Sequence, residues 1–531
     1  MGCAAFSRNS GARRLPLTRT GVSTQAQRVL IVKGAVRIFK AFPALAVTLA
    51  LALTHLSAAT AATSRLPRPV TQALAAAHIP PAAVSAVVVD LDTGKSVFAT
   101  QDRTPRNAAS LMKLVTTFAA LELLTPDYRW TTEVYADGAL ADGVLAGDLI
   151  FRGAGDPRLD YESFWMLLRA LRARGLREIR GRVIVDRSRF APDTDEPIDE
   201  ESFRPYNVPP DALLVNYKAV RFVFLPDLAR NAVRIFVQPP LPGMAIVNEL
   251  SIVERSCPEG RAFRELIGAA FERRPPRASF TGVFPASCGE RDLNVALHAP
   301  DDYFAAMFEH LWTELGGTWS GELGAGSVPP TARLIHSHES RPLGEIVRDI
   351  NKFSNNVMAR QLFLTLGAEL AGPPGQPAGA ERAVAEWLSA KGIRAPELRL
   401  DNGSGLSRTA RISARTLGAL LEAAWRSPVM PEFVAALPVA ALDGTMRKRL
   451  NDHPVAGRAH MKTGLLSDVR SMAGYVLDRR GRRRALVVIV NHAKAHDAQA
   501  ALDAFLAWVY AGATAPASPT ARPRAASPRR P

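Results

Sequence analysis

The sequence predicts an α/β fold in which one antiparallel sheet flanked by helices is assembled from both ends of the chain and interrupted by inserted β-rich domains. Near the N-terminus, two strand patterns within 84–100 surround a turn, and apolar residues at helical spacing follow over 111–124. The C-terminal part repeats this order, with two strand patterns within 472–490 and a helix over 497–510. Because both ends combine strands with a following helix, we expect their strands to share one sheet.

The middle of the chain, residues 128–332, has a different pattern. Short runs of β-strand composition, such as Val183 to Asp186, are broken there by proline and glycine, which predicts strands joined by turns. Residues 366–380 are rich in glycine and proline and predict a loop. We therefore expect a leader with a signal peptide at 1–62, the first part of the sheet-and-helix domain at 66–127, inserted β-rich domains at 128–332, the second part of the first domain at 333–512 and a disordered tail at 513–531.

The net charge lies mainly at the two ends of the chain. The formal charge is +16, but eight basic residues lie in the first forty positions and four in the last ten. Without those twelve residues the formal charge falls to +4. A nucleic-acid-binding domain would carry its basic residues in the folded part, so this distribution argues against nucleic acid as a partner.

The N-terminal region has the composition of a secretory signal peptide. A basic stretch ends at Lys40, an apolar run follows from Phe42 to Leu53, and small residues from Ser57 to Ala62 offer cleavage sites. The apolar run is short for a membrane span, and an uncleaved anchor helix is the alternative. We expect export, after which Cys257 and Cys288 are the only cysteines left. A disulfide between them is the favoured interpretation, and two free thiols are the alternative.

Three short motifs that carry reactive side chains occur in order along the chain. Ser110 is the only serine with a lysine, Lys113, three positions later, and the only Lys-Thr-Gly is at 462–464. Between them lies Ser354-Asn355-Asn356, the only Ser-x-Asn after the leader. Each motif alone is weak, so their order and context provide the evidence.

The local context of the first motif favours a nucleophile. Ser110 lies where a loop enters a helix, so Lys113 is one turn away on the same face. Burial and nearby hydrogen-bond donors could keep this amine neutral enough to act as a base, and an amide at the helix start supplies an oxyanion donor.

The other two motifs predict the surroundings of that nucleophile. Lys462-Thr463-Gly464 precedes the last strand patterns, which predicts an edge strand lining a cleft, with a lysine and a hydroxyl for a carboxylate and a glycine that gives the substrate room. Ser354 and Asn356 follow a helical run and could complete a hydrogen-bond network around Ser110.

The set S-x-x-K, S-x-N and K-T-G resembles the signature of penicillin-binding proteins and class A β-lactamases. About 240 residues separate Lys113 from Ser354, which resembles the class C low-molecular-mass DD-carboxypeptidase/endopeptidases, the penicillin-binding protein 4-type peptidases of family S13. Further segments look like this family's: Gly153 to Pro157, Asn351 to Asn356, Asp401 to Arg408, Asp443 to Met446 and Met472 to Tyr475. The resemblance covers about 80 to 510 and implies a penicillin-recognising (β-lactamase/transpeptidase-like) domain.

The resemblance implies a serine-type D-Ala-D-Ala carboxypeptidase/endopeptidase that acts on peptidoglycan stem peptides in the periplasm, needs no metal or other cofactor, and takes β-lactams as covalent inhibitors. Ser110 would be acylated with Lys113 as its base, while Ser354 and Asn356 assist proton transfer. Lys462, Thr463 and Gly464 would bind the substrate, and the amides of Ser110 and Leu465 would form the oxyanion hole. Leu465 stands where the family usually has a small hydroxyl residue.

The resemblance also implies a side pocket for the diaminopimelate end of the substrate. Its arginine corresponds to Arg408. Its acid would be Glu201 or Asp199, with Tyr206 stacking beside it.

Several residues have a simpler explanation. Ser404 lacks the spacing of a nucleophile elbow and is expected in a structural turn. His336 and His338 alternate as on a strand without a third ligand, which favours polar surface residues. The cluster from Arg479 to Arg484 is most simply a solvated hairpin tip, although it could contact anionic cell-wall polymers.

Two other functions remain open. A β-lactamase would share the nucleophile, but the long insertion and the lack of a recognisable deacylation glutamate argue against it. A catalytically inactive cell-wall-binding protein would not need Ser110 and Lys113.

Overall fold

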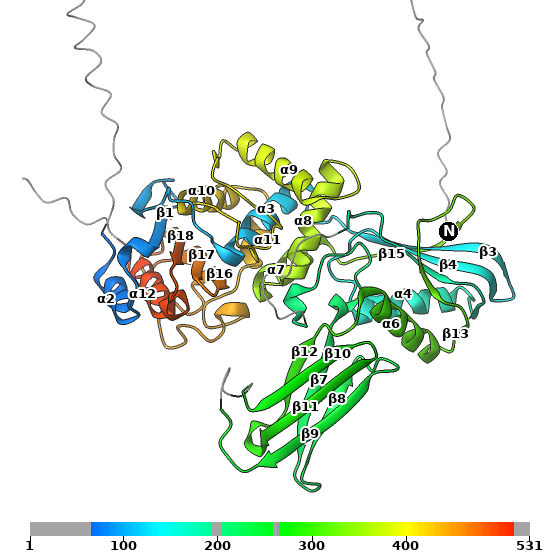
Figure 1. Cartoon of the computed structure of the whole chain (residues 1–531). Helices are drawn as coiled ribbons and strands as arrows, with labels where there is room; N and C mark the ends of the chain where they lie inside the picture. The colour runs from blue at the N-terminus through cyan, green and yellow to red at the C-terminus, as the bar shows by residue number, and fades with distance from the viewer. Residues whose placement is uncertain (1–64, 193–202, 259–262, 264, 514–531) are drawn as a thin grey trace, which may run out of the picture. The chain divides into compact units, whose positions relative to one another are not determined.

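An antiparallel sheet joins the two ends of the chain, as the sequence predicts (Figure 1). The computed structural model describes residues 65–192, 203–258, 263 and 265–513. In spatial order the strands are β16 (Ala459–Leu466), β17 (Val469–Leu477), β18 (Arg483–Asn491), β1 (Val84–Asp90) and β2 (Ser96–Thr100). β1 therefore lies between a C-terminal strand and its own hairpin partner, and β16 is an edge strand.

Both faces of this sheet are buried, because alternate residues of its strands face two different layers of helices. Ala86 and Val88 belong to a core shared with α2 (Arg68–Ala76) and α12 (Gln499–Tyr510). Val87 and Val89 belong to the core on the opposite face, where α10 (Ala414–Trp425) contacts the sheet. The central strands consequently show nearly continuous burial instead of alternation.

The remaining helices of this domain surround the second core. They are α3 (Met112–Leu123), α7 (Leu343–Phe353), α8 (Asn356–Leu370), α9 (Pro377–Ala390) and α11 (Met430–Ala435). The prediction of a loop over 366–380 is wrong at both of its ends. α8 continues to Leu370, and Pro377 is the first residue of α9, where a missing N–H and a fixed φ favour the helix.

The inserted part begins with a sheet that also contains parallel pairs. It consists of β3 (Thr131–Ala141), β4 (Val144–Gly153), β5 (Glu178–Ile179), β6 (Val183–Asp186), β13 (Thr318–Trp319), β14 (Leu323–Ala325) and β15 (Arg333–Glu339). Because β15 pairs with β3, the insertion extends to Glu339 and not to the predicted boundary at 332. α4 (Tyr161–Ala173) and α6 (Pro300–Glu314) share a core with this sheet, so the insertion is not purely β-rich.

Two smaller sheets form the rest of the insertion. One contains β7 (Val220–Asp227), β8 (Ala232–Gln238) and β12 (Arg291–Val295), and the other contains β9 (Ala245–Val253), β10 (Ile267–Arg273) and β11 (Pro276–Pro285). The ring of Phe280 packs against both Phe222 and Phe224. Its centroid lies 5.1 Å from that of Phe222 and 5.0 Å from that of Phe224. The predicted disulfide between Cys257 and Cys288 is confirmed, with Cα atoms 4.8 Å apart.

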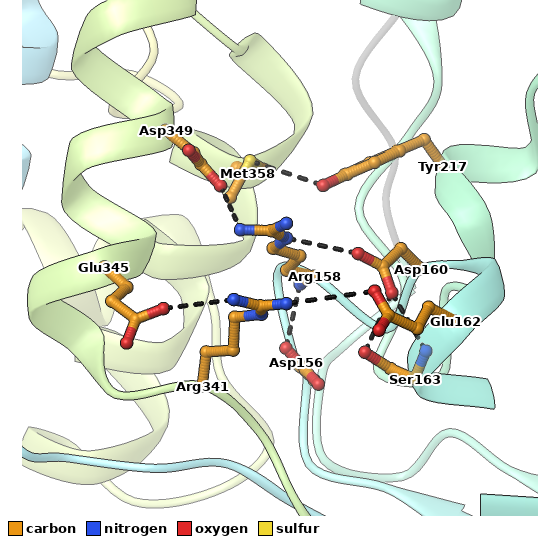
Figure 2. Close-up of polar contacts among 10 residues, drawn as sticks. All are labelled: Asp156, Arg158, Asp160, Glu162, Ser163, Tyr217, Arg341, Glu345, Asp349 and Met358. Carbon is orange, nitrogen blue, oxygen red and sulfur yellow. Dashed lines mark hydrogen bonds and ion pairs between the residues drawn. The ribbon is translucent and has the colours of Figure 1, made fainter. Parts of the chain in front are cut away.

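Arg158 joins the insertion to helix α7, as Figure 2 shows. Its guanidinium donates to Asp160 at 3.1 Å and to Asp349 of α7 at 2.6 Å. The backbone N–H of Arg158 donates to the buried carboxylate of Asp156 at 2.8 Å, and burial raises the pKa of Asp156 to about 7. Asp349 lies five residues before Ser354, so this contact fixes the helix that leads to the second motif.

The expected leader (1–62) and all but the first residue of the expected tail (513–531) lie outside the described residues. Within the described part of the chain, no helix combines the length and apolar character needed to cross a membrane.

Candidate active site

Ser110 lies in a tight turn that opens onto helix α3. The 3-10 turn Ala109–Leu111 leads directly into α3, as expected for a loop-to-helix junction. Ala109 has a φ of 48°, which is uncommon for a residue other than glycine. This left-handed residue stands immediately before the half-buried Ser110.

Lys113 is fully buried and makes three contacts that define its chemistry. Its Nζ lies 3.0 Å from Ser110 Oγ, 2.6 Å from Asn356 Oδ1 and 2.6 Å from the carbonyl oxygen of Ser404. The amide and carbonyl oxygens can only accept hydrogen bonds. A neutral amine has two N–H groups for these two acceptors, and its lone pair is then free for the hydroxyl of Ser110.

Burial favours this neutral amine. Desolvation lowers the pKa of Lys113 well below its usual value, and the charge of Lys462 lowers it further. Lys462 is also fully buried, and its own desolvation lowers its pKa to about 7. Both lysines thus lose protons far more readily than lysines in water.

The second motif lies at the junction of two helices. Ser354 caps α7 in a left-handed conformation, with φ 57° and ψ 36°, and α8 begins two residues later at Asn356. Asn355 caps α8 by accepting a hydrogen bond from the N–H of Met358 at 3.1 Å. The junction therefore directs Asn356 to Lys113 and Ser354 to Lys462.

The third motif lies on edge strand β16, as predicted. Lys462 Nζ donates to Ser354 Oγ at 2.8 Å and to the carbonyl of Thr463 at 2.7 Å. The hydroxyl of Thr463 donates to that of Thr445 at 2.8 Å. Leu465, which follows the motif on this strand, is 56% exposed.

Gly464 has a role that the sequence prediction did not include. A Cβ atom at this position would overlap with Ser471 Oγ and lie within 2.7 Å of the carbonyl oxygen of Ala108. Ser471 Oγ itself donates to that carbonyl at 2.7 Å. The glycine therefore lets the edge strand pack against the turn that carries Ser110, in addition to the predicted room for substrate.

The loop from Asp401 to Arg408 supplies an acceptor for Lys113, a contact that the sequence prediction missed. Ser404 is in a turn, as expected, but its carbonyl is one of the two acceptors for Lys113. Asn402 holds this turn by accepting from the N–H and the hydroxyl of Ser404 at 3.1 and 2.8 Å. A Cβ atom at Gly405 would overlap with the carbonyl oxygen of Ala109, so close packing at this point requires glycine.

Asn107 is a second residue that the sequence prediction missed. Its Oδ1 accepts from the N–H of Ala109 at 2.9 Å, and its Nδ2 donates to the carbonyl of Ser407 at 2.8 Å. Its backbone N–H and carbonyl pair with the side chain of Asn491, the last residue of β18, at 3.0 and 2.8 Å. Asn107 therefore ties the Ser110 turn to the sheet and to the 401–408 loop.

An ion pair links helix α7 to the turn that carries Thr445. Lys352, which is 4% exposed, donates to Asp443 at 2.6 Å. Burial alone would raise the pKa of Asp443, but the hydrogen bonds from Lys352 and from the N–H of Val439 lower it below its usual value. Asp443 precedes the turn that carries Thr445, the partner of Thr463.

The predicted side-pocket residues are only partly described. Arg408 is exposed at the end of its loop, and Tyr206 is half-buried in the 3-10 turn Pro205–Asn207. Glu201 and Asp199 lie outside the described residues. His336 and His338 lie on β15, and no group of three or more potential metal ligands occurs in the described part of the chain.

An antiparallel sheet flanked by helices, with Ser-x-x-Lys at a helix start beside an edge strand bearing Lys-Thr-Gly, defines the class of penicillin-recognising serine enzymes. The chain belongs to the D-Ala-D-Ala carboxypeptidase 3 (S13) family, whose model matches residues 68–509. Its enzyme class is therefore that of the serine-type D-Ala-D-Ala carboxypeptidases.

Similar proteins agree with this assignment. A D-alanyl-D-alanine carboxypeptidase of Actinomadura sp. (strain R39) is 31% identical over 430 residues, which cover 76% of this chain and 77% of that protein. D-alanyl-D-alanine carboxypeptidase DacB of Haemophilus influenzae is 26% identical over 389 residues, or 72% of this chain and 80% of that protein. The crystal structure of penicillin binding protein 4 (dacB) from Haemophilus influenzae matches with a TM-score of 0.69 at 23% identity, covering 84% of this chain and 99% of that chain.

We expect Asn107→Ala to slow acylation by a fluorescent penicillin about 10- to 100-fold, because the turn that aims Ser110 and its amide loses an anchor. The measurement is the second-order acylation rate, with thermal unfolding alongside. Asn107→Asp keeps the acceptor for Ala109 and should fall between the wild type and the alanine variant. Asn451→Ala, at an exposed turn residue, is the matched control.

If Asn107 has a purely structural role, Asn107→Ala should unfold at a lower temperature, while the protein that remains folded is acylated at the wild-type rate. That result would refute positioning.

Proposed function

We propose that this enzyme hydrolyses the D-alanyl peptide bond at the ends or cross-links of peptidoglycan stem peptides through an acyl-enzyme on Ser110. The observation that carries the proposal is the contact set of Lys113, whose two acceptor oxygens leave the lone pair of a neutral amine for the serine hydroxyl. Family membership supports the same reaction class.

In the first half-reaction, Lys113 takes the proton of Ser110 as Oγ attacks the carbonyl carbon of the penultimate D-alanine. The negative charge that develops on the carbonyl oxygen is held by the amides of Ser110 and Leu465. Collapse breaks the C–N bond, and the leaving amine takes the proton, with Ser354 and Lys462 forming the second donor path into the site. An ester with Ser110 remains.

In the second half-reaction, water attacks this ester while Lys113 accepts a proton from the water. The C–O bond breaks, the proton returns to Ser110 Oγ, and the shortened peptide leaves with a new carboxylate. Asn356 and the Ser404 carbonyl keep the amine in place through both steps.

Lys462 and Thr463 bind the terminal carboxylate of the substrate in this proposal. The buried ammonium of Lys462 supplies the charge, and the hydroxyl of Thr463 supplies a donor on the edge strand. Arg408, Glu201 and Tyr206 are proposed to form the side pocket for the diaminopimelate end.

β-Lactams would acylate the same serine. A solved structure of the similar penicillin binding protein 4 from Haemophilus influenzae contains a β-lactam, with a TM-score of 0.63 and 23% identity. A β-lactamase is the alternative activity, and the rate at which the penicilloyl ester is hydrolysed separates the two.

We expect a fluorescent penicillin to label the purified protein covalently and Ser110→Ala to remove the label completely. Ser404→Ala, which retains the carbonyl that contacts Lys113, should keep the label and serves as the control serine. If Ser110→Ala is labelled as strongly as the wild type, the proposed nucleophile is wrong. Rapid consumption of penicillin without a stable label would identify a β-lactamase.

The shifted pKa of Lys462 predicts how its charge, and with it the binding of the substrate carboxylate, changes with pH. Lys462, with a pKa of about 7, is charged below that pH and loses its charge above it. We expect kcat/KM for a peptide with a free D-Ala-D-Ala carboxylate to fall about tenfold between pH 7 and 9, since an ionic hydrogen bond is lost. Burial lowers the pKa of Lys113 well below its usual value, which favours its neutral form with either peptide.

The same peptide with an amidated C-terminus is the control. It has no carboxylate for Lys462, so its kcat/KM should stay level over the same range. An equal decline for both peptides would contradict the carboxylate role of Lys462.

We also propose that the chain is exported to the periplasm after cleavage of the leader. Expression of the full chain in a Gram-negative host should give a periplasmic protein whose N-terminus lies close to Ala62. Leu49→Arg, in the apolar run, should keep the precursor in the cytoplasm. Recovery of the uncleaved chain in the membrane fraction would instead support an anchor helix.

A further inference from the structure

Lys218 is the one lysine between residues 114 and 351. At its other basic positions, this stretch uses arginine or histidine. Lysine differs from arginine in being a compact point charge whose pKa shifts readily on burial.

The side chain of Lys218 is largely buried, and it lines a pocket. The residue is 7% exposed. Within the described parts of the chain, its Nζ makes no hydrogen bond or ion pair, although buried charges are normally paired. A largely buried amine without a partner among the described residues would be stabilised by an anion bound in the pocket that it lines.

The backbone at this lysine is strained. Asn216, Tyr217 and Lys218 have φ values of 47°, 53° and 52°, three successive left-handed residues without a glycine. Contacts on both sides hold this turn. Asn216 Nδ2 donates to the hydroxyl of Tyr303 at 2.8 Å, and the Tyr217 hydroxyl lies 3.6 Å from Met358 Sδ of helix α8 (Figure 2).

Lys218 lines a pocket of about 530 Å³, a volume within the range of small-molecule sites. The pocket lies between the ends of β6 and β14, the loop after the 3-10 turn Pro205–Asn207, and the start of α6. Most of its wall is apolar, with Phe190, Val208 and Leu214 among the lining residues.

The two carboxylates among the described wall residues already accept hydrogen bonds. Asp186 accepts from the N–H groups of Ser188 and Val328 at 2.9 and 3.0 Å. Asp211 accepts from Arg187 at 2.7 Å. Neither carboxylate is within ion-pair distance of Lys218 in the described structure.

A second buried base stands near Lys218. His298 is 2% exposed, and neither ring nitrogen has a hydrogen-bond partner among the described residues. Burial lowers the pKa of His298, and the charge of Lys218 contributes to the same shift. Because His298 is kept neutral, the ammonium of Lys218 supplies the positive charge in this region that an anion would need.

We propose that this pocket is a second binding site, which takes a monocarboxylate carried on a small apolar body. One ammonium matches one carboxylate, and the apolar wall suits an aliphatic group such as the methyl of alanine. A phosphate dianion would need more donors and would be repelled by Asp186 and Asp211. The free D-alanine end of a stem peptide has this chemistry; that choice of source rests on the proposed function, whereas the carboxylate site does not.

Binding should depend on pH in a defined direction. Burial and the charge of Arg273 lower the pKa of Lys218 to about 8, while Asp211 acts in the opposite direction. Arg187 is paired with Asp211, and His298 is held neutral by burial. The lysine therefore loses its charge above pH 8, and carboxylate affinity should decline from pH 7 to pH 9.

The test uses the full chain with Ser110 first acylated by benzylpenicillin, so that the active site is blocked. The probe is N-acetyl-D-alanyl-D-alanine, and binding is followed by saturation-transfer NMR. We expect the acylated wild type to bind the peptide, Lys218→Met to weaken binding at least tenfold, and the exposed-lysine control Lys95→Met to bind as the wild type does. Methionine removes a buried unpaired amine at similar volume, so the variant should fold.

The outcomes separate the two proposals. Failure of Ser110 to acylate refutes the proposed function. Acylation without peptide binding, or equal binding by Lys218→Met, refutes the second site. Propionate that competes as well as the peptide would support a carboxylate site and refute the stem peptide as its source, and competition by inorganic phosphate would refute the carboxylate class. If Lys218→Met does not fold, wild-type affinity that stays constant between pH 7 and 9 would refute the role of Lys218.

Discussion

The active site depends on one buried amine. Removing the charge of a lysine from water is so unfavourable that a fully buried Lys113 is stable only if its N–H groups are matched by acceptors and its pKa falls. The acceptors come from Asn356 at the start of α8 and from the carbonyl of Ser404. The same requirement that satisfies the amine also leaves its lone pair for Ser110, so stability and reactivity have a common origin.

This arrangement brings together segments that the chain separates by about 240 residues and more. The insertion must therefore not displace α7 and α8, and hydrogen bonds from the insertion hold both helices. Arg158 reaches Asp349 of α7, while the backbone of Asp211 exchanges two hydrogen bonds of 2.8 Å with the side chain of Gln361 of α8. The helix junction that carries Ser354 and Asn356 is thus held from the insertion side as well as from the sheet.

The sequence predicted those parts that short-range patterns encode. Alternating and continuous apolar runs gave β1, β17 and β18, and the three motifs located Ser110, Ser354 and Lys462 on the elements where the structure places them. What it missed depends on partners far away in the chain. Asn107 acquires its role through Ser407 and Asn491, 300 and 384 positions later, and the Ser404 carbonyl contacts an amine 291 positions earlier.

The misplaced boundaries have the same origin. His336 and His338 alternate in the sequence as on a strand, but only the pairing of β15 with β3 assigns this strand to the insertion. The sequence predicted that Gly464 makes room for the substrate. It did not predict that this glycine also makes room for Ser471 and the Ala108 carbonyl, because neither is adjacent to Gly464 in sequence. A local pattern identifies an element or a reactive side chain, whereas the packing that surrounds it is a property of the folded chain.

Three buried lysines of this chain show how partners determine chemistry when burial is similar. Lys113, with two acceptor oxygens, is matched as a neutral amine and is suited to take a proton. Lys462 has a hydroxyl and one carbonyl, and its pKa of about 7 leaves it able to carry charge for a substrate carboxylate. Lys218 has no acceptor among the described residues, which is why we propose it as the group that binds an anion. Burial lowers the pKa in all three cases, but the number of acceptors in place distinguishes a base from a site for an anion.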